Sequence, residues 1–148
     1  MEKKLPLNNK IYFLIEDGQN KVFHEDDVFF SLVIEDKKYL IEKDSFLYEI
    51  KQVLEHFCDK SNYVETTDLD LGFEYFKYQS DFSSKSDVHR FDCYLAFSND
   101  KIAVLFYKRN NQLFCHATVN EWGKCFNTIC LESLNEKILA NWRKVLEC

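Results

Sequence analysis

The stretch SLNEKILANWRKVLE, residues 133–147, contains the sharpest helix signal of the chain. Ser133 and Glu136 match a capping box, in which the serine hydroxyl accepts an amide hydrogen three residues on and the glutamate reaches back to the serine amide. Apolar side chains then recur at helical spacing, at Leu134, Ile138, Leu139, Trp142, Val145 and Leu146. The stretch therefore predicts a helix over residues 133–147 with Trp142 in the core.

A second helix is predicted over residues 44–58, with Asp44 as its N-cap and apolar residues at Phe46, Leu47, Ile50, Val53, Leu54 and Phe57. Other apolar runs are rich in strand formers, over 10–16, 28–34, 38–41, 73–78, 90–97, 102–107, 113–119 and 122–131. Asn110-Asn111 is a hairpin turn signal between two of them. We predict an α+β fold, a single domain over residues 1–148, in which an antiparallel β-sheet packs against two or more helices.

The composition indicates a densely packed domain with few loops, since 14 Phe, 8 Tyr and 2 Trp accompany only 3 Gly and 1 Pro. No apolar run approaches the roughly 20 residues of a membrane span. The first residues are charged and carry no apolar signal segment, so we expect a cytoplasmic protein. Without a secretory signal, the six cysteines are predicted to be reduced thiols.

Charge is unevenly distributed along the chain, whose formal net charge is −6. Residues 1–100 contain 12 Lys or Arg and 21 Asp or Glu, whereas residues 101–148 contain 7 and 4. The acidic part argues against binding to nucleic acid, which requires a basic face. It suits a basic protein partner, although solubility alone also explains an acidic surface.

One acidic segment combines charge with aromatic residues. Between Ser61 and Phe76 there are four carboxylates and no Lys or Arg, and Tyr63, Phe73, Tyr75 and Phe76 are interleaved with them. Such a surface offers charge complementarity and aromatic anchors to a basic partner. A solvated loop is the alternative. We predict that the partner-binding residues are Glu65, Asp68, Asp70, Glu74 and Tyr75. A second acidic cluster, Glu25-Asp26-Asp27, is read as a charged turn.

No motif for catalysis, metal binding or cofactor binding is recognised. The three glycines, at 18, 72 and 123, do not form a phosphate-binding loop, and no Cys-x-x-Cys pair occurs. Asp68 and Asp70 could face a hard cation, but the twelve-residue calcium loop pattern is not met. The histidines are interpreted as structural. The sequence therefore predicts no cofactor, no metal and no enzyme activity.

In this general character the chain resembles the immunity proteins of bacterial polymorphic-toxin systems, including those of contact-dependent growth inhibition. The resemblance covers the whole chain and rests on small size, acidity, aromatic content and an α+β pattern, not on a shared motif. It implies that the protein binds a cognate toxin domain, often a basic nuclease, and neutralises it by occluding the active site. Two alternatives remain: a phage-encoded inhibitor or nucleic-acid mimic, and a small hydrolase that uses His116 or His24.

Overall fold

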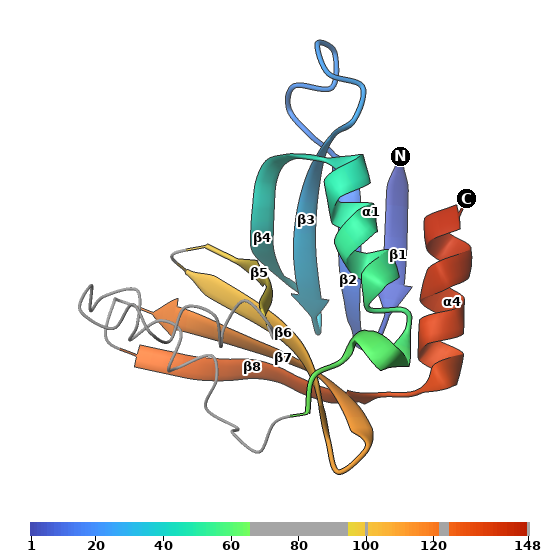
Figure 1. Ribbon diagram of the computed structural model, residues 1–148. Helices are drawn as coiled ribbons and strands as arrows, with labels where there is room; N and C mark the ends of the chain where they lie inside the picture. The colour runs from blue at the N-terminus through green and yellow to red at the C-terminus, as the bar shows by residue number, and fades with distance from the viewer. Residues whose placement is uncertain (66–94, 100, 122–124, 148) are drawn as a thin grey trace, which may run out of the picture. The chain divides into compact units, whose positions relative to one another are not determined.

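The computed structural model describes residues 1–65, 95–99, 101–121 and 125–147 (Figure 1). The chain divides into two compact units. Unit 1 consists of Met1–Asn62 and Asn135–Cys148, and unit 2 consists of Tyr63–Leu134. Unit 1 is therefore discontinuous in sequence, with unit 2 inserted between its two parts.

Unit 1 contains a four-stranded antiparallel sheet in which each strand pairs with the next along the chain. Its strands are β1 (Glu2–Pro6), β2 (Ile11–Asp17), β3 (Asp27–Ile34) and β4 (Lys37–Phe46). The two central strands are the most apolar, and the Phe13 ring of β2 stacks on the Phe30 ring of β3 at 5.3 Å. Between β3 and β4, Glu35 and Asp36 both have positive φ, at 48° and 72°, which is the geometry of a tight hairpin turn.

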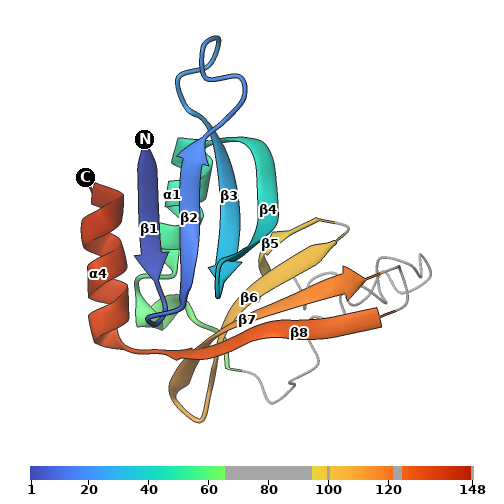
Figure 2. The same cartoon turned by 180° about the vertical axis from the view of Figure 1, so that it is seen from behind.

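Two helices complete unit 1: α1 (Leu47–His56) and α4 (Glu136–Glu147). A short 3-10 turn, Lys60–Asn62, follows α1. Figures 1 and 2 show α1 across one face of the sheet and α4 alongside β1. The α1 helix buries Ile50 and Leu54, whereas α4 buries Leu139, Trp142 and Leu146. The predicted core position of Trp142 is confirmed, because its side chain is 0% exposed.

Both predicted helix caps are wrong. The first helix begins after Phe46, which makes no side-chain capping bond, and Asp44 lies in β4 with a positive φ of 54°. In the last helix Asn135 replaces Ser133 as the cap, since its Oδ1 accepts the amide hydrogen of Ile138 at 2.9 Å. Ser133 belongs to a strand that continues to Leu134. The helices are thus shorter at their N-terminal ends than the sequence pattern predicts.

Unit 2 contains a second four-stranded antiparallel sheet, again with sequential pairing. Its strands are β5 (Leu95–Ser98), β6 (Ile102–Arg109), β7 (Gln112–Glu121) and β8 (Cys125–Leu134). Residues 102–107 of β6 are all buried. The predicted hairpin turn between β6 and β7 is confirmed, because Asn110 and Asn111 have φ values of 52° and 64°.

The predicted α+β class is confirmed, with helices and antiparallel strands, and the strands are shared between two sheets. The predicted strand over 73–78 lies outside the described residues. That residues 1–148 form one domain stays a prediction. Free, buried thiols are found at Cys58, Cys115 and Cys130, as predicted for these three positions.

Candidate partner-binding surface

Glu65 is the first residue of the predicted acidic interface, and it is anchored to the β6–β7 hairpin. Its backbone forms a parallel bridge to Lys108 of β6, and the Lys108 amide donates to the carbonyl of Val64 at 3.0 Å. Its carboxylate Oε1 accepts the amide hydrogen of Asn110 at 2.7 Å. Glu65 therefore fixes where the acidic segment leaves the sheet, while its side chain stays exposed to solvent.

The remaining residues of that interface, Asp68, Asp70, Glu74 and Tyr75, lie outside the described residues. Just before Glu65, Tyr63 is buried, and its ring meets the Phe106 ring edge-on at 6.2 Å. The first aromatic residue of the acidic segment is therefore a core residue of unit 2 and is not available to a partner.

The loop between β2 and β3, residues 18–26, has a second combination of acidic and aromatic groups. It projects beyond the ends of both strands at the top of Figure 1. Its tip carries Val22 and Phe23, whose side chains are 90% and 83% exposed. From the sequence, only the acidic end of this loop was singled out. An apolar pair inside an otherwise polar turn was the available signal.

Three further rings extend the apolar surface from the loop to the start of α1. The His24 ring meets the Phe46 ring edge-on at 6.2 Å, and Phe46 stacks on Tyr48 at 5.9 Å. Phe46 and Tyr48 are 39% and 54% exposed. Together, Val22, Phe23, His24, Phe46 and Tyr48 are called the loop-tip surface below.

Acidic groups accompany the loop-tip surface. Glu25 and Asp26 are exposed, whereas the neighbouring Asp27 is buried and begins β3. The prediction that Asp27 belongs to a charged turn is therefore wrong. Partial burial, followed by repulsion from Glu49, raises the pKa of Glu42 above its usual value. The carboxylates of Glu42 on β4 and Glu49 on α1 are thus close enough to repel each other.

The two histidines of the hydrolase alternative have different surroundings. His116 is 2% exposed, and its Nε2 lies 3.0 Å from Thr128 Oγ1 and 3.2 Å from Thr118 Oγ1. This burial leaves no access for a substrate to the ring. His24 is exposed on the loop, where its ring packs against Phe46. Neither geometry gives the hydrolase alternative any support.

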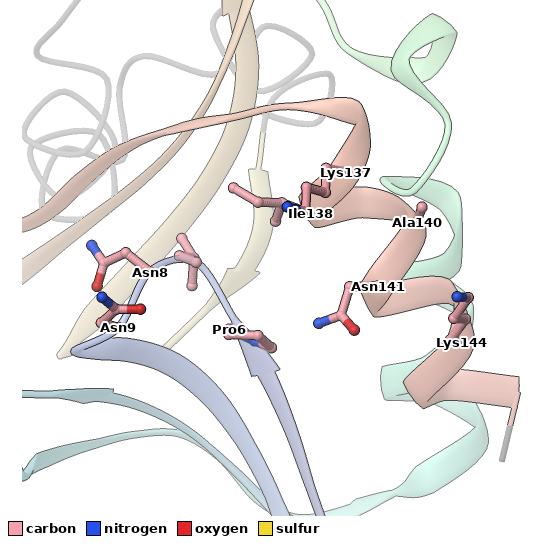
Figure 3. A pocket seen from close by; sticks show the side chains of 9 residues that line it. Pro6, Asn8, Asn9, Lys137, Ile138, Ala140, Asn141 and Lys144 are labelled. Carbon is pink, nitrogen blue, oxygen red and sulfur yellow. The ribbon is translucent and has the colours of Figure 1, made fainter.

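A depression of about 470 Å³ lies in unit 1 between the β1–β2 turn and α4 (Figure 3). Asn8 and Asn9 of the turn face Lys137, Asn141 and Lys144 of the helix across it. Its complete lining contains no histidine, cysteine or carboxylate. The depression therefore lacks the imidazole, carboxylate and thiol groups that hydrolytic chemistry commonly uses.

The described residues contain neither a cluster of metal ligands nor a helix that could cross a membrane. Within them, no group of three or more His, Cys, Asp or Glu side chains is arranged to hold a metal ion. Among the same residues, no helix has the length and apolar character needed to cross a membrane.

Comparison with known proteins gives a match in structure and none in sequence. No family model matches the chain, and no characterised protein matches it in sequence. A solved structure, CdiI from Burkholderia dolosa AUO158, is similar with a TM-score of 0.59 and 12% sequence identity. The match covers 99% of each chain. CdiI is a contact-dependent growth inhibition immunity protein. At this identity the match shows a shared fold.

Proposed function

We propose that the protein is an immunity protein that binds a cognate toxin domain and neutralises it. The observation that carries the proposal is the fold shared with CdiI over 99% of both chains. A fold alone does not specify a function. Here it agrees with the resemblance of the sequence, in size, acidity, aromatic content and α+β pattern, to the immunity proteins of bacterial polymorphic-toxin systems. The fold and the general character of the sequence therefore favour the same activity.

The proposed mechanism is occlusion of the active site of a basic nuclease toxin. A nuclease must attract a phosphate backbone, so its active site lies in a basic surface. An acidic protein competes for that surface, and its charge speeds the encounter. Binding then blocks substrate access without any chemistry by the inhibitor. No cofactor is required for this function.

The acidic segment is the first proposed contact, through Glu65, Asp68, Asp70, Glu74 and Tyr75. The described part supports this role in one respect. The bonds from Val64 and Glu65 to the β6–β7 hairpin hold the start of the segment in place. A segment anchored at its start loses less conformational freedom on binding than a free one, which favours affinity.

The test is co-expression with the cognate toxin domain, once it is identified by pull-down from the native host or by gene neighbourhood, together with association kinetics on the purified pair. Wild-type protein should protect the cells and bind the toxin domain. Asp68→Lys with Asp70→Lys should slow association and weaken protection, most strongly at low salt, because the charge field is screened within about 10 Å at 0.1 M. The control is the double variant Glu2→Lys with Glu55→Lys, which makes the same change in net charge. It should leave the association rate and the protection of the cells nearly unchanged.

The outcomes separate the function from the residues. If the wild-type protein neither binds nor protects, the immunity proposal fails. If it does both and the double reversal at Asp68 and Asp70 behaves like the control, immunity stands and this segment is not in the interface.

A further inference from the structure

We infer that the loop-tip surface of unit 1 is a docking site for the toxin domain. Phe23 is the anchor and enters an apolar pocket of the toxin domain, and basic side chains of the toxin domain surround that pocket. This inference rests on the proposed function and adds a second contact to it. The loop-tip surface lies in unit 1, whereas the proposed contact residues of the acidic segment, from Glu65 onward, belong to unit 2. The two contacts involve different residues and can be tested separately.

The loop is held by its own hydrogen bonds. The amide of Gly18 donates to the carbonyl of Asp27 at 2.9 Å, and the amide of Asn20 donates to Asp27 Oδ2 at 2.8 Å. The amides of Phe23 and His24 both donate to the carbonyl of Asn20, at 2.9 and 2.8 Å. The tip is therefore a closed turn that presents its side chains in a defined arrangement.

A further bond ties the loop to the helix. The amide of Leu47, the first residue of α1, donates to the carbonyl of Asp26 at 2.8 Å. The start of α1 therefore stays beside the end of the loop, and with it Phe46 and Tyr48. Such preorganisation favours a binding site, because little ordering remains for the partner to impose.

The apolar content of this surface has no explanation within unit 1. Val22 and Phe23 are almost fully exposed, although the loop has polar residues on both sides of them. Isolated exposed apolar residues are ordinary, whereas a contiguous group with neighbouring rings marks an interaction site. Phe23, Phe46 and Tyr48 supply the large rigid rings that dominate binding energy at protein interfaces.

The charge around these rings identifies the partner as basic. Residues 17–27 contain four carboxylates and one lysine. That lysine, Lys21, and the N-terminal ammonium are both paired with Asp17 at 2.6 Å. Asp27 is buried, so Glu25 and Asp26 are the carboxylates of this stretch that can meet a partner. Glu25 and Asp26 are exposed next to the ring of His24. Lysine or arginine side chains of a partner would match these carboxylates and could also lie over the exposed ring faces.

The experiment compares one double variant, Val22→Ser together with Phe23→Ser, with the wild-type protein. The probe is the cognate toxin domain identified by pull-down or by gene neighbourhood. We expect binding to weaken by about 30-fold or more, mainly through faster dissociation, because a hot-spot aromatic is lost. The matched control is Leu131→Ser on β8, where the side chain is 46% exposed outside the loop-tip surface. Its binding should change less than about twofold.

Charge and burial are tested by two further variants. Glu25→Lys with Asp26→Lys should slow association and flatten its salt dependence. Phe23→Trp should keep binding, and its added fluorescence should shift to the blue with the toxin domain, as the indole leaves water. The native chain contains Trp122 and Trp142, so the emission of the wild-type protein, free and bound, is measured as the background.

The results distinguish this inference from the function on which it rests. If the wild-type protein does not bind the toxin domain, the docking inference and the proposed immunity function are both refuted. If it binds and protects while the double serine variant binds within twofold of it, the loop-tip surface is not the docking site and immunity stands. An unshifted Phe23→Trp emission in a formed complex would likewise overturn the inference. Because both side chains are exposed, the double serine variant should melt like the wild type, and the Phe23→Trp readout is available if it does not.

Discussion

Replacing Trp142 by alanine tests how strongly α4 is held in unit 1. The indole is fully buried, meets the Phe13 ring edge-on at 5.8 Å, and donates from Nε1 to the carbonyl of Pro6 at 2.7 Å. Truncating a buried aromatic residue costs about 3–5 kcal/mol through lost burial and the cavity left behind. Domains have a total stability of about 5–15 kcal/mol, so we expect the alanine variant to lose a large part of it. At about 2–4 °C per kcal/mol, the melting temperature should fall by roughly 6–20 °C.

The assay is urea unfolding followed by far-ultraviolet circular dichroism, because the substitution itself alters fluorescence. Trp142→Phe keeps an aromatic ring but removes the donor to Pro6, so it should cost about 1–3 kcal/mol. Asn141→Ala, on the exposed side of the same helix turn, is the control and should stay within about 0.5 kcal/mol. A loss below about 1 kcal/mol for Trp142→Ala would refute the reasoning, since it would mean that the indole does not hold α4.

Three other changes are predicted from the structure. Gly18→Ala should lower the free energy of unfolding in urea by about 1–3 kcal/mol, because the added Cβ would lie 2.2 Å from Asp27 Oδ2 and the carboxylate must then move. An unchanged urea midpoint would argue against this close approach. Glu42→Gln should raise the melting temperature at pH 7, since a raised pKa means that charging Glu42 disfavours the folded state. This gain should disappear as the pH falls below the ordinary glutamate value of 4.5, and a pH-independent gain would contradict the explanation by charge. Burial raises the pKa of the Cys115 thiol, so iodoacetamide should modify Cys115 only after unfolding, as peptide mass spectrometry can show; rapid labelling of the native protein would count against its burial.

The central strands could be predicted from the sequence because their apolar content is local information. Residues 10–16 and 28–34 match β2 and β3 to within one residue at each end. Strand β1 was missed, because Glu2–Pro6 contains two lysines and a proline and few strand formers. It is extended because it pairs with β2, with Leu5 opposite Phe13. That pairing is tertiary, and no local pattern reports it.

The last helix shows how tertiary structure overrides a local signal. Ser133 to Glu136 match the capping box, yet Ser133 pairs with Phe114 of β7 and extends the strand. Asn135, also a favoured N-cap residue, takes the capping role instead. The periodic apolar residues were nevertheless predicted correctly, since Leu139, Trp142 and Leu146 are all buried.

The candidate site was harder to predict than the fold. Composition identified an acidic, aromatic protein, but the sequence cannot show which aromatic residues are buried. Tyr63 was counted with the acidic segment and is a core residue, whereas Phe23 looked unremarkable and is 83% exposed. Exposure depends on how the loop closes, and that closure requires the buried Asp27, which the sequence analysis assigned to a charged turn.

The insertion of unit 2 into unit 1 has a consequence for the order of events during translation. The ribosome makes β1 first, and α4, which packs beside it, more than a hundred residues later. The bond from Trp142 to Pro6 spans 136 residues, so α4 cannot reach β1 until unit 2 has been synthesised. Unit 2 is continuous in sequence, and its sequential hairpins can form while α4 is still inside the ribosome. In a nascent chain, the edge of β1 and the Phe13 ring that Trp142 contacts would then stay without α4 until that helix has emerged from the ribosome, so this edge is the last part of unit 1 to be completed.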